Sequence, residues 1–175
     1  MFISPEQIIK TIGVKLGSRV ADFGSGAGFY AVPLARAVGA GGRVYALDVQ
    51  PEMLEITRSK TREARLLNVS VMRVDLEKPR GTGLADDAVD VVLMSNILFQ
   101  AENKPNMLKE ASRILKSGGE IALIEWSSYG RGAGPRPEQI IPKESAEKLL
   151  TDAGFKRIKE FSAGDSHYGL LYAKP

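Results

Sequence analysis

The stretch that decides the fold is Val20-Ala21-Asp22-Phe23-Gly24-Ser25-Gly26-Ala27-Gly28-Phe29-Tyr30, where an apolar run leads into a glycine-rich turn. Glycines in such a turn permit positive φ angles and let a ligand approach the backbone closely. The N-terminus of a helix that follows the turn offers free N–H groups. The stretch therefore predicts a strand, a ligand-binding turn and a helix; a tight turn that holds no ligand is the alternative.

Short β-rich runs alternate with helical patterns on the C-terminal side of this turn. We expect strands at residues 19–23, 43–48, 69–74, 89–95 and 120–126, with helices at 29–38, 51–66 and 104–116. Such alternation is typical of βαβ units, in which a parallel sheet carries helices on both faces. The strands are nearly continuous apolar runs, as expected for a sheet that is buried on both faces.

The last part of the chain departs from this alternation. A helical pattern at 143–153 precedes two β-rich runs, 155–161 and 168–174, whose connection is much shorter than a parallel crossover requires. These two strands should form a hairpin. The predicted fold class is α/β: a three-layer sandwich around a seven-stranded, mostly parallel, Rossmann-like sheet that ends in an antiparallel hairpin strand. Residues 1–175 are expected to form a single domain.

The composition bounds the chemistry that the chain can carry. Of its 175 residues, 43% are hydrophobic and 26% are charged, which is typical of a soluble globular domain. There is no cysteine, so a disulfide framework, a thiolate-bound metal and a thiol nucleophile are excluded. A single histidine, His167, excludes a histidine-rich metal site as well. We therefore expect no metal.

The sequence says less about the cellular location of the protein and about its binding partners. No apolar run is long enough for a transmembrane helix, and the first residues do not resemble a signal peptide, so a cytoplasmic location is expected. The formal net charge is +3. The basic residues are spread along the chain, which favours solvated helix faces over a phosphate-binding patch but leaves a nucleic-acid partner possible. The sequence leaves the oligomeric state open.

The glycine-rich turn does not match the phosphate-binding patterns. Counted from Gly24, the last position of a dinucleotide fingerprint falls on Phe29 instead of glycine or alanine. Asp22 at the mouth of the turn would repel a pyrophosphate and favour a cationic group. Asp48, at the end of the second predicted strand, can accept both hydroxyls of a ribose. Asp75, after the third, could accept the amino group of an adenine.

An amino acid, a ribose and an adenine without phosphate together make S-adenosylmethionine. Over residues 10–175 the chain resembles class I S-adenosylmethionine-dependent methyltransferases, and the order and spacing of several segments carry this resemblance. These segments are Asp22–Gly28, Leu47–Leu54, Val74–Glu77, Leu84–Val92 and Leu108–Gly119. The resemblance implies S-adenosyl-L-methionine as the cofactor and methyl transfer as the reaction.

The resemblance also implies which residues bind the cofactor, and each falls at the end of a predicted strand or in the turn that follows it. The glycine-rich turn would lie against the methionine and ribose, with Asp22 facing the ammonium group through water. The expected cofactor residues are Asp22, Gly24, Ser25, Gly26 and Gly28, then Asp48 for the ribose, Val49, Met53, Asp75 and Leu76 for the adenine, and Ser95 and Asn96 for the methionine end.

The methyl acceptor is constrained by what is missing. Cytosine C5 methylation requires a cysteine nucleophile, and amino-nitrogen methylation of nucleic acids typically uses an Asn/Asp-Pro-Pro-Tyr/Phe motif; the chain has neither. The segment Ser95–Phe99, together with Ile124–Trp126, resembles the small "type 11" branch related to ubiquinone and menaquinone biosynthesis. This branch mostly methylates small molecules, which we take as the predicted function. The alternatives are an RNA- or protein-directed methyltransferase and a non-catalytic S-adenosylmethionine-binding module.

Candidate acceptor residues lie near the fifth strand and the hairpin. A loop rich in glycine and proline, Ser127–Pro142, leaves the fifth strand where an acceptor would enter, and we expect it to close over the acceptor or to be a solvated connection. His167 is the candidate general base because its ordinary pKa suits proton removal at neutral pH; a structural histidine is the alternative. The expected acceptor-binding residues, of which the aromatic ones could instead be core, are Phe99, Trp126, Tyr129 and Arg131.

Overall fold

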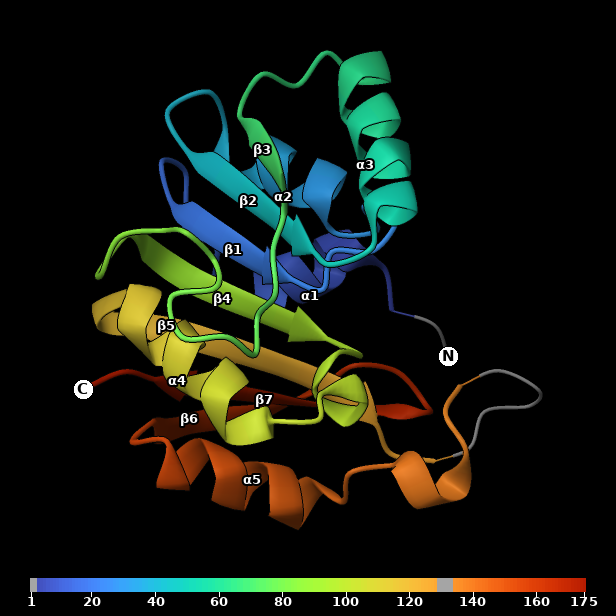
Figure 1. The fold of residues 1–175 in the computed structure, drawn as a ribbon, viewed down its shortest axis with the longest axis vertical. Coiled ribbons are helices and arrows are strands. Elements are labelled where there is room, and N and C mark those ends of the chain that lie inside the picture. The colour runs from blue at the N-terminus through green and yellow to red at the C-terminus, as the bar shows by residue number, and fades with distance from the viewer. Residues whose placement is uncertain (1–2, 129–133) are drawn as a thin grey trace.

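The computed structural model describes residues 3–128 and 134–175, and their seven strands form one sheet (Figure 1). The strand order across the sheet is β3-β2-β1-β4-β5-β7-β6. The strands β1 to β5 pair in parallel, whereas β7 is antiparallel to both of its neighbours. The strands are β1 (Arg19–Phe23), β2 (Arg43–Asp48), β3 (Val69–Arg73), β4 (Val89–Ser95), β5 (Leu115–Trp126), β6 (Lys156–Ser162) and β7 (His167–Ala173).

Helices cover both faces of the sheet, which confirms the three-layer α/β sandwich. Buried isoleucines and leucines of α1 and α2 pack against one face, and those of α4 and α5 pack against the other. The helix α3 lies beside α2 and contacts β2 and β3, and α5 lies along the β6–β7 hairpin (Figure 1). The helices are α1 (Pro5–Thr11), α2 (Ala31–Val38), α3 (Pro51–Glu63), α4 (Lys104–Ile114) and α5 (Lys143–Asp152), with the 3-10 helices η1 (Leu98–Gln100) and η2 (Pro137–Gln139).

Among the described residues, α1 is the one α-helix that was not expected from the sequence. The helix α1 begins after Ser4, whose hydroxyl accepts a hydrogen bond from the Gln7 backbone N–H, while the Gln7 side chain accepts one from the Ser4 N–H. This capping box, followed by Pro5 at the first helical position, was a readable signal. The helix is short, and its burial of Ile8 and Ile9 stabilises it more than its local sequence does.

A second difference concerns the connection before β5. The predicted helix 104–116 ends at Ile114, and β5 already begins at Leu115. Gly118 has a φ of +73° inside this strand, and its N–H donates to the Lys174 carbonyl at 2.9 Å. By sequence Gly118-Gly119 suits the end of a helix, but this expectation was wrong: the helix ends earlier, at Ile114, and Gly118 forms a bend within the extended strand.

The topology gathers the candidate residues at one edge of the sheet. Parallel strands end at the same edge, where open α/β sheets bind ligands. Asp48 and Ser95 are the last residues of β2 and β4, and Phe23 at the end of β1 pairs with Leu47 on one side and Met94 on the other. In the described part of the chain, no helix has the length and apolarity to cross a membrane.

Candidate cofactor and acceptor site

A cavity of about 430 Å³ lies at the C-terminal ends of the parallel strands. Its wall comes from the β1–α2 turn, the end of β2, the segment after β3, and the η1 segment after β4. Of the expected cofactor residues, those that line it are Gly24, Gly26, Asp48, Val49, Met53, Asp75 and Leu76. The remaining lining residues were not predicted from the sequence; they are Gln50, Val74, Glu77, Ile97, Gln100, Ala101 and Met107.

The three glycines of the turn have different physical roles. All have positive φ, at +69° for Gly24, +51° for Gly26 and +77° for Gly28. A Cβ on Gly24 would lie 2.6 Å from Ile97 Cδ1, and one on Gly28 would lie 2.9 Å from Thr57 Oγ1. A Cβ on Gly26 would meet no heavy atom within 4 Å. Gly24 and Gly28 are therefore required by packing, while Gly26 presents bare backbone to open space.

Asp48 organises the turn from the end of β2. Its side chain is only 6% exposed. Oδ2 accepts a hydrogen bond from the Gly26 N–H at 2.8 Å, and Oδ1 accepts one from the Gln50 N–H at 2.9 Å. Each carboxylate oxygen can accept a further bond. Asp48 thus fixes the turn and still offers acceptors toward the cavity, as the binding of two ribose hydroxyls requires.

Asp22 is a second acid at this edge, and it is 2% exposed. Burial, followed by repulsion from Asp48, raises the pKa of its carboxyl from 3.8 to about 7. Its Oδ2 is buried and has no hydrogen-bond partner in the part of the chain that the structure describes. A buried acceptor without a partner is costly, and an ammonium group, directly or through water, would satisfy it. Asp22 does not line the cavity itself.

The residues expected at the methionine end lie around β4. Asn96 has a φ of +55°, and its N–H donates to the Ile124 carbonyl of β5 at 2.9 Å. The Ser95 hydroxyl hydrogen-bonds with that of Tyr30, a contact that the sequence did not reveal. Ser25 Oγ and Asn96 Oδ1 are buried without a partner among residues 3–128 and 134–175. Neither Ser25, Ser95, Asn96 nor Gly28 lines the cavity.

The segment after β3 forms the side of the cavity assigned to adenine. The Val74 N–H donates to the Asp48 carbonyl at 2.9 Å, so this segment continues alongside β2. Asp75 accepts a hydrogen bond from the Glu77 N–H at 3.1 Å and pairs with Lys78 Nζ at 3.3 Å. Part of the acceptor capacity expected for adenine is thus already used within the segment. Leu76 is buried and Val49 is exposed at the cavity wall.

The expected acceptor residues lie farther along the same edge. Trp126 and His167 are paired in register between β5 and β7, and their ring centroids are 4.1 Å apart. A Cβ on Gly134 would lie 3.0 Å from the Trp126 ring, so the backbone of the returning loop packs on the indole. Phe99 is half-buried and packs against the core on the α4 and α5 side. Neither Phe99, Trp126 nor His167 lines the cavity.

His167 combines burial with an unpartnered nitrogen. Its Nε2 is buried and has no hydrogen-bond partner among the described residues, and burial lowers the pKa of the imidazole. A lowered pKa keeps the ring neutral near pH 7, which a proton acceptor requires. The predicted acceptor residues Tyr129 and Arg131 lie outside the described residues. The rest of the loop Ser127–Pro142 includes η2, and the Ser127 N–H donates to the Ser166 carbonyl at 2.8 Å.

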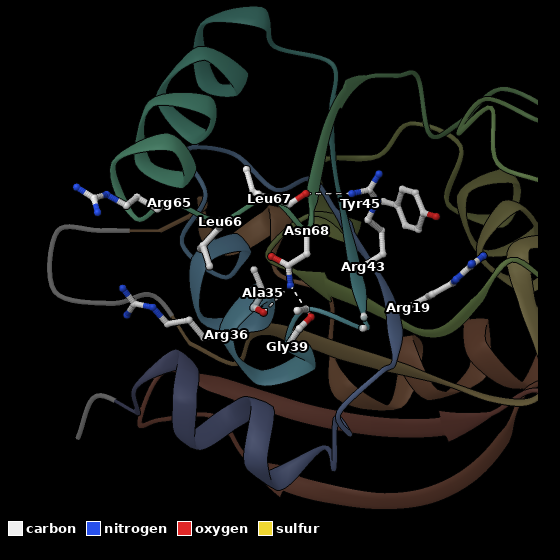
Figure 2. Close-up of a pocket in the computed structure, with 13 residues that line it drawn as sticks. Arg19, Ala35, Arg36, Gly39, Arg43, Tyr45, Arg65, Leu66, Leu67 and Asn68 are labelled. Carbon is white, nitrogen blue, oxygen red and sulfur yellow. Dashed lines mark hydrogen bonds between the residues drawn. The ribbon is translucent and has the colours of Figure 1, made fainter.

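A larger hollow, of about 770 Å³, lies at the opposite edge of the sheet (Figure 2). Asn68 donates both of its side-chain hydrogen bonds to the Ala35 and Gly39 carbonyls at the end of α2, each at 2.8 Å. In Figure 2, Arg36 and Arg65 extend to one side, whereas Arg19 extends to the other. The guanidinium groups do not converge, and no expected cofactor residue lines this hollow. The candidate cofactor site is therefore the smaller cavity, which the expected cofactor residues line.

Comparison with known proteins identifies the family. The family model "Methyltransferase domain" (Methyltransf_11) matches residues 21–123, and the chain belongs to this family. It is a class I domain whose cofactor is S-adenosyl-L-methionine. The chain is 33% identical to a SAM-dependent methyltransferase from Aquifex aeolicus, with a TM-score of 0.88 over 96% of this chain and 88% of that one. A type 11 methyltransferase structure from Sulfolobus solfataricus, at 23% identity and a TM-score of 0.79 over 99% and 94% of the two chains, shows the same fold.

Curated relatives point to one branch of the family. The chain is 32% identical, over 116 residues, to the ubiquinone/menaquinone biosynthesis C-methyltransferase UbiE of Haemophilus ducreyi. That match covers 66% of this chain and 44% of the relative. The demethylmenaquinone methyltransferase of Geobacillus sp. is 30% identical over 122 residues, 70% of this chain and 51% of the relative. The chain thus spans about half the length of these relatives.

Proposed function

We propose that this chain transfers the methyl group of S-adenosylmethionine to a small-molecule acceptor, and that a quinol-like ring is the acceptor to test first. The observation that carries the proposal is the pairing of a bare glycine backbone with a ribose-type carboxylate, Gly26 with Asp48, in one cavity. The choice of ring rests on what the printed names of the UbiE and demethylmenaquinone relatives say of those proteins.

The proposed chemistry requires little of the protein beyond binding and alignment. When bound, the cofactor supplies an electrophilic methyl group, and the protein's contribution is to orient the acceptor and exclude water. We assign Asp48 to the ribose hydroxyls and Asp22 to the ammonium group. Glycines 24 and 26 would lie against the cofactor, and Val49 and Met53 would flank the adenine.

At the acceptor end, we assign two side chains from β5 and β7. Trp126 would pack against a flat apolar ring, because aromatic pairs prefer stacked or edge-to-face contacts. His167 would take the proton that the acceptor loses, since its burial keeps the imidazole neutral at pH 7. Tyr129 and Arg131 stay predictions for acceptor contacts. Residues 1–175 acting as one domain, and a cytoplasmic location, also stay predictions.

The experiment is a turnover assay that follows S-adenosylhomocysteine release with a panel of acceptors. The panel holds a demethylated menaquinol analogue, other small phenols and quinols, a mixed RNA oligonucleotide and a protein lysate fraction. We expect release with a small quinol-like ring and none with RNA. Release with RNA or protein alone would contradict the proposed acceptor class. Cofactor binding without release across the whole panel would favour a non-catalytic binding module.

A further inference from the structure

Glu125 is a completely buried carboxyl group, at 0% exposure, to which the proposed chemistry assigns no role. It is the penultimate residue of β5 and lies opposite Tyr168 of β7. Its Oε1 accepts hydrogen bonds from the backbone N–H groups of Leu98, at 2.7 Å, and Phe99, at 3.4 Å. Its Oε2 has no hydrogen-bond partner within residues 3–128 and 134–175. The side chain therefore ties the end of one strand to the segment that follows another.

The tied segment is a wall of the cofactor cavity. Ile97, Gln100 and Ala101 line the cavity, and the two amides that Glu125 holds lie between them in η1. The Asn96 N–H donates to the Ile124 carbonyl at 2.9 Å, so β5 holds the segment at two successive residues. Gln100 Nε2 donates to the Asn96 carbonyl at 2.7 Å and closes the turn. Displacing Glu125 would remove one of these two attachments and leave the Leu98 and Phe99 amides without their acceptor.

A second buried glutamate offers a direct comparison within the same chain. Glu110, at 3% exposure, also accepts backbone N–H groups, from Arg80 at 3.2 Å and Thr82 at 3.1 Å. Arg113 Nη2 lies 2.7 Å from Glu110 Oε1. Burial alone would raise the pKa of Glu110, but the hydrogen bonds from Arg113 and Thr82 outweigh it and lower this pKa to about 2. Glu110 is thus a tie with a cationic partner, and none of these residues lines the cofactor cavity.

Glu125 is a tie without such a partner. It forms no ion pair with any described residue, and burial raises its pKa to about 7 even though the N–H groups of residues 97–99 and 126 favour the ionised form. The polar side chains of the paired strand β7 at this point are Tyr168, whose hydroxyl donates to the Ile141 carbonyl at 2.9 Å, and His167. A buried carboxyl without a cation is expensive for a merely structural tie. Because Glu125 lies beside the cavity wall, a role in ligand binding explains why this unfavourable burial is kept.

We propose that Glu125 is a positioning residue for S-adenosylmethionine: it holds residues 97–101 as the cavity wall and through that wall sets the affinity for the cofactor. The carboxylate acts on the cofactor only through the backbone of Leu98 and Phe99. The side chain must therefore carry an acceptor oxygen and be long enough to place it against these two amides. Loss of either property should weaken cofactor binding, whereas loss of the hydrogen bonds that Glu110 accepts should lower only the stability of the fold.

The test compares four variants by calorimetric titration with S-adenosylmethionine, with hydrogen exchange of the Leu98 and Phe99 amides as the local readout. Glu125→Ala removes the acceptor, and Glu125→Asp keeps the charge but shortens its reach; both should weaken affinity by about tenfold or more, the loss of one to two such hydrogen bonds. Glu125→Gln keeps an acceptor oxygen and should stay within about threefold of wild type. Glu110→Ala should lower the unfolding temperature and leave the affinity within the same limit.

Three outcomes would overturn the proposal. The first is Glu125→Ala or Glu125→Asp binding the cofactor as wild type does while the Leu98 and Phe99 amides exchange faster. The second is Glu125→Gln losing as much affinity as Glu125→Ala, which would mean that charge and not an acceptor is required. The third is a loss of affinity in Glu110→Ala as large as that in Glu125→Ala, which would mean that both variants weaken cofactor binding by destabilising the fold as a whole. If Glu125→Ala does not fold, the Asp and Gln variants decide the question by the same criteria.

Discussion

The Gly26 backbone N–H donates a hydrogen bond to Asp48 Oδ2 across 2.8 Å, and this bond joins the glycine-rich turn to the end of the neighbouring strand. The same carboxylate also accepts the Gln50 N–H, so Asp48 fixes two turns at once. Thr57 Oγ1 donates to the Gly26 carbonyl at 2.8 Å from the other side. The backbone of Gly26 is therefore held at both of its polar groups before any ligand binds, which lowers the ordering cost of binding.

Replacing Asp48 tests the ribose assignment. Asp48→Ala removes the acceptors for the ribose and the anchor of Gly26, and each charge-assisted hydrogen bond is worth roughly 1.5–3 kcal/mol. We expect S-adenosylmethionine affinity to fall by about 10- to 100-fold. Asp48→Asn keeps one acceptor oxygen but places an amide donor against a backbone N–H. Its affinity should lie between those of wild type and Asp48→Ala. Calorimetry that finds unchanged affinity in Asp48→Ala would remove the assignment.

A valine at position 26 separates ligand contact from folding. The site of its Cβ is open space, so Gly26→Val should strain only the local backbone and leave a folded protein with no measurable cofactor binding. Gly28→Val is the matched control: its Cβ would meet Thr57 at 2.9 Å, so this variant should lose stability as well as binding. The measurements are circular-dichroism melting and calorimetric titration. Cofactor binding by Gly26→Val would show that the backbone there does not contact the ligand.

Asp22 predicts a pH dependence whose sign follows from its raised pKa. The folded protein holds the Asp22 proton up to about pH 7, whereas the unfolded chain loses it near 3.8. Asp22 therefore contributes stability that is fully present below pH 3.8 and is lost as pH rises through about 7. Asp22→Asn should remove this slope, which amounts to at most roughly 4 kcal/mol for a shift of this size. Urea unfolding at pH 5 and pH 8 measures the part of it that is lost between pH 5 and about 7, roughly 2.7 kcal/mol, as the difference between wild type and variant.

The same proton couples to the cofactor. The ammonium group should favour ionised Asp22, so affinity for S-adenosylmethionine should rise as pH increases from 5.5 to 7.5, an interval chosen to bracket the raised pKa of about 7. In Asp22→Asn the affinity should be weaker and should change less with pH. An unaltered pH profile in the variant would place the ammonium elsewhere.

The Trp126–His167 pair tests the acceptor end separately. Neither residue lines the cofactor cavity, so Trp126→Ala and His167→Asn should leave S-adenosylmethionine affinity nearly unchanged. We expect Trp126→Ala to raise the KM of the acceptor and His167→Asn to lower kcat by about 100-fold or more, the usual contribution of a general base. Trp126→Phe, which keeps an aromatic ring, is the control. If Trp126→Ala and His167→Asn both turn over as wild type does, the contact between Trp126 and His167 is only structural.

The features that could be predicted from the sequence are those that local sequence patterns determine. The periodic apolar runs and the short final connection were sufficient for the sheet, its helices and its antiparallel strand, because these features depend on local patterns. The short helix α1 was missed although Ser4 and Gln7 carried its capping signal. Asp48 and Gly26 could be predicted because a motif of fixed spacing contains them.

The residues that the sequence analysis missed depend on tertiary placement. Ile97 and Gln100 reach the cavity because Asn96 adopts a positive φ and η1 folds back against Glu125, and no local pattern encodes that contact. Tyr30, at the start of α2, and Ser95, at the end of β4, are far apart in the sequence, and only the fold brings their hydroxyls together. Conversely, Gly28 belongs to the motif, but the structure places it against Thr57 and away from the cavity.

The central claim is tested most directly by a crystal structure of the chain with bound S-adenosylhomocysteine. The account predicts the ligand in the cavity at the C-terminal ends of the strands, with both ribose hydroxyls on the Asp48 carboxylate and the backbone of Gly26 against the ligand. Its amino group should lie toward Asp22 and its adenine between Val49 and Met53, with the adenine edge toward Asp75 and Leu76. A ligand bound in another place, such as the arginine-lined hollow at the opposite edge, or one whose ribose does not contact Asp48, would contradict it.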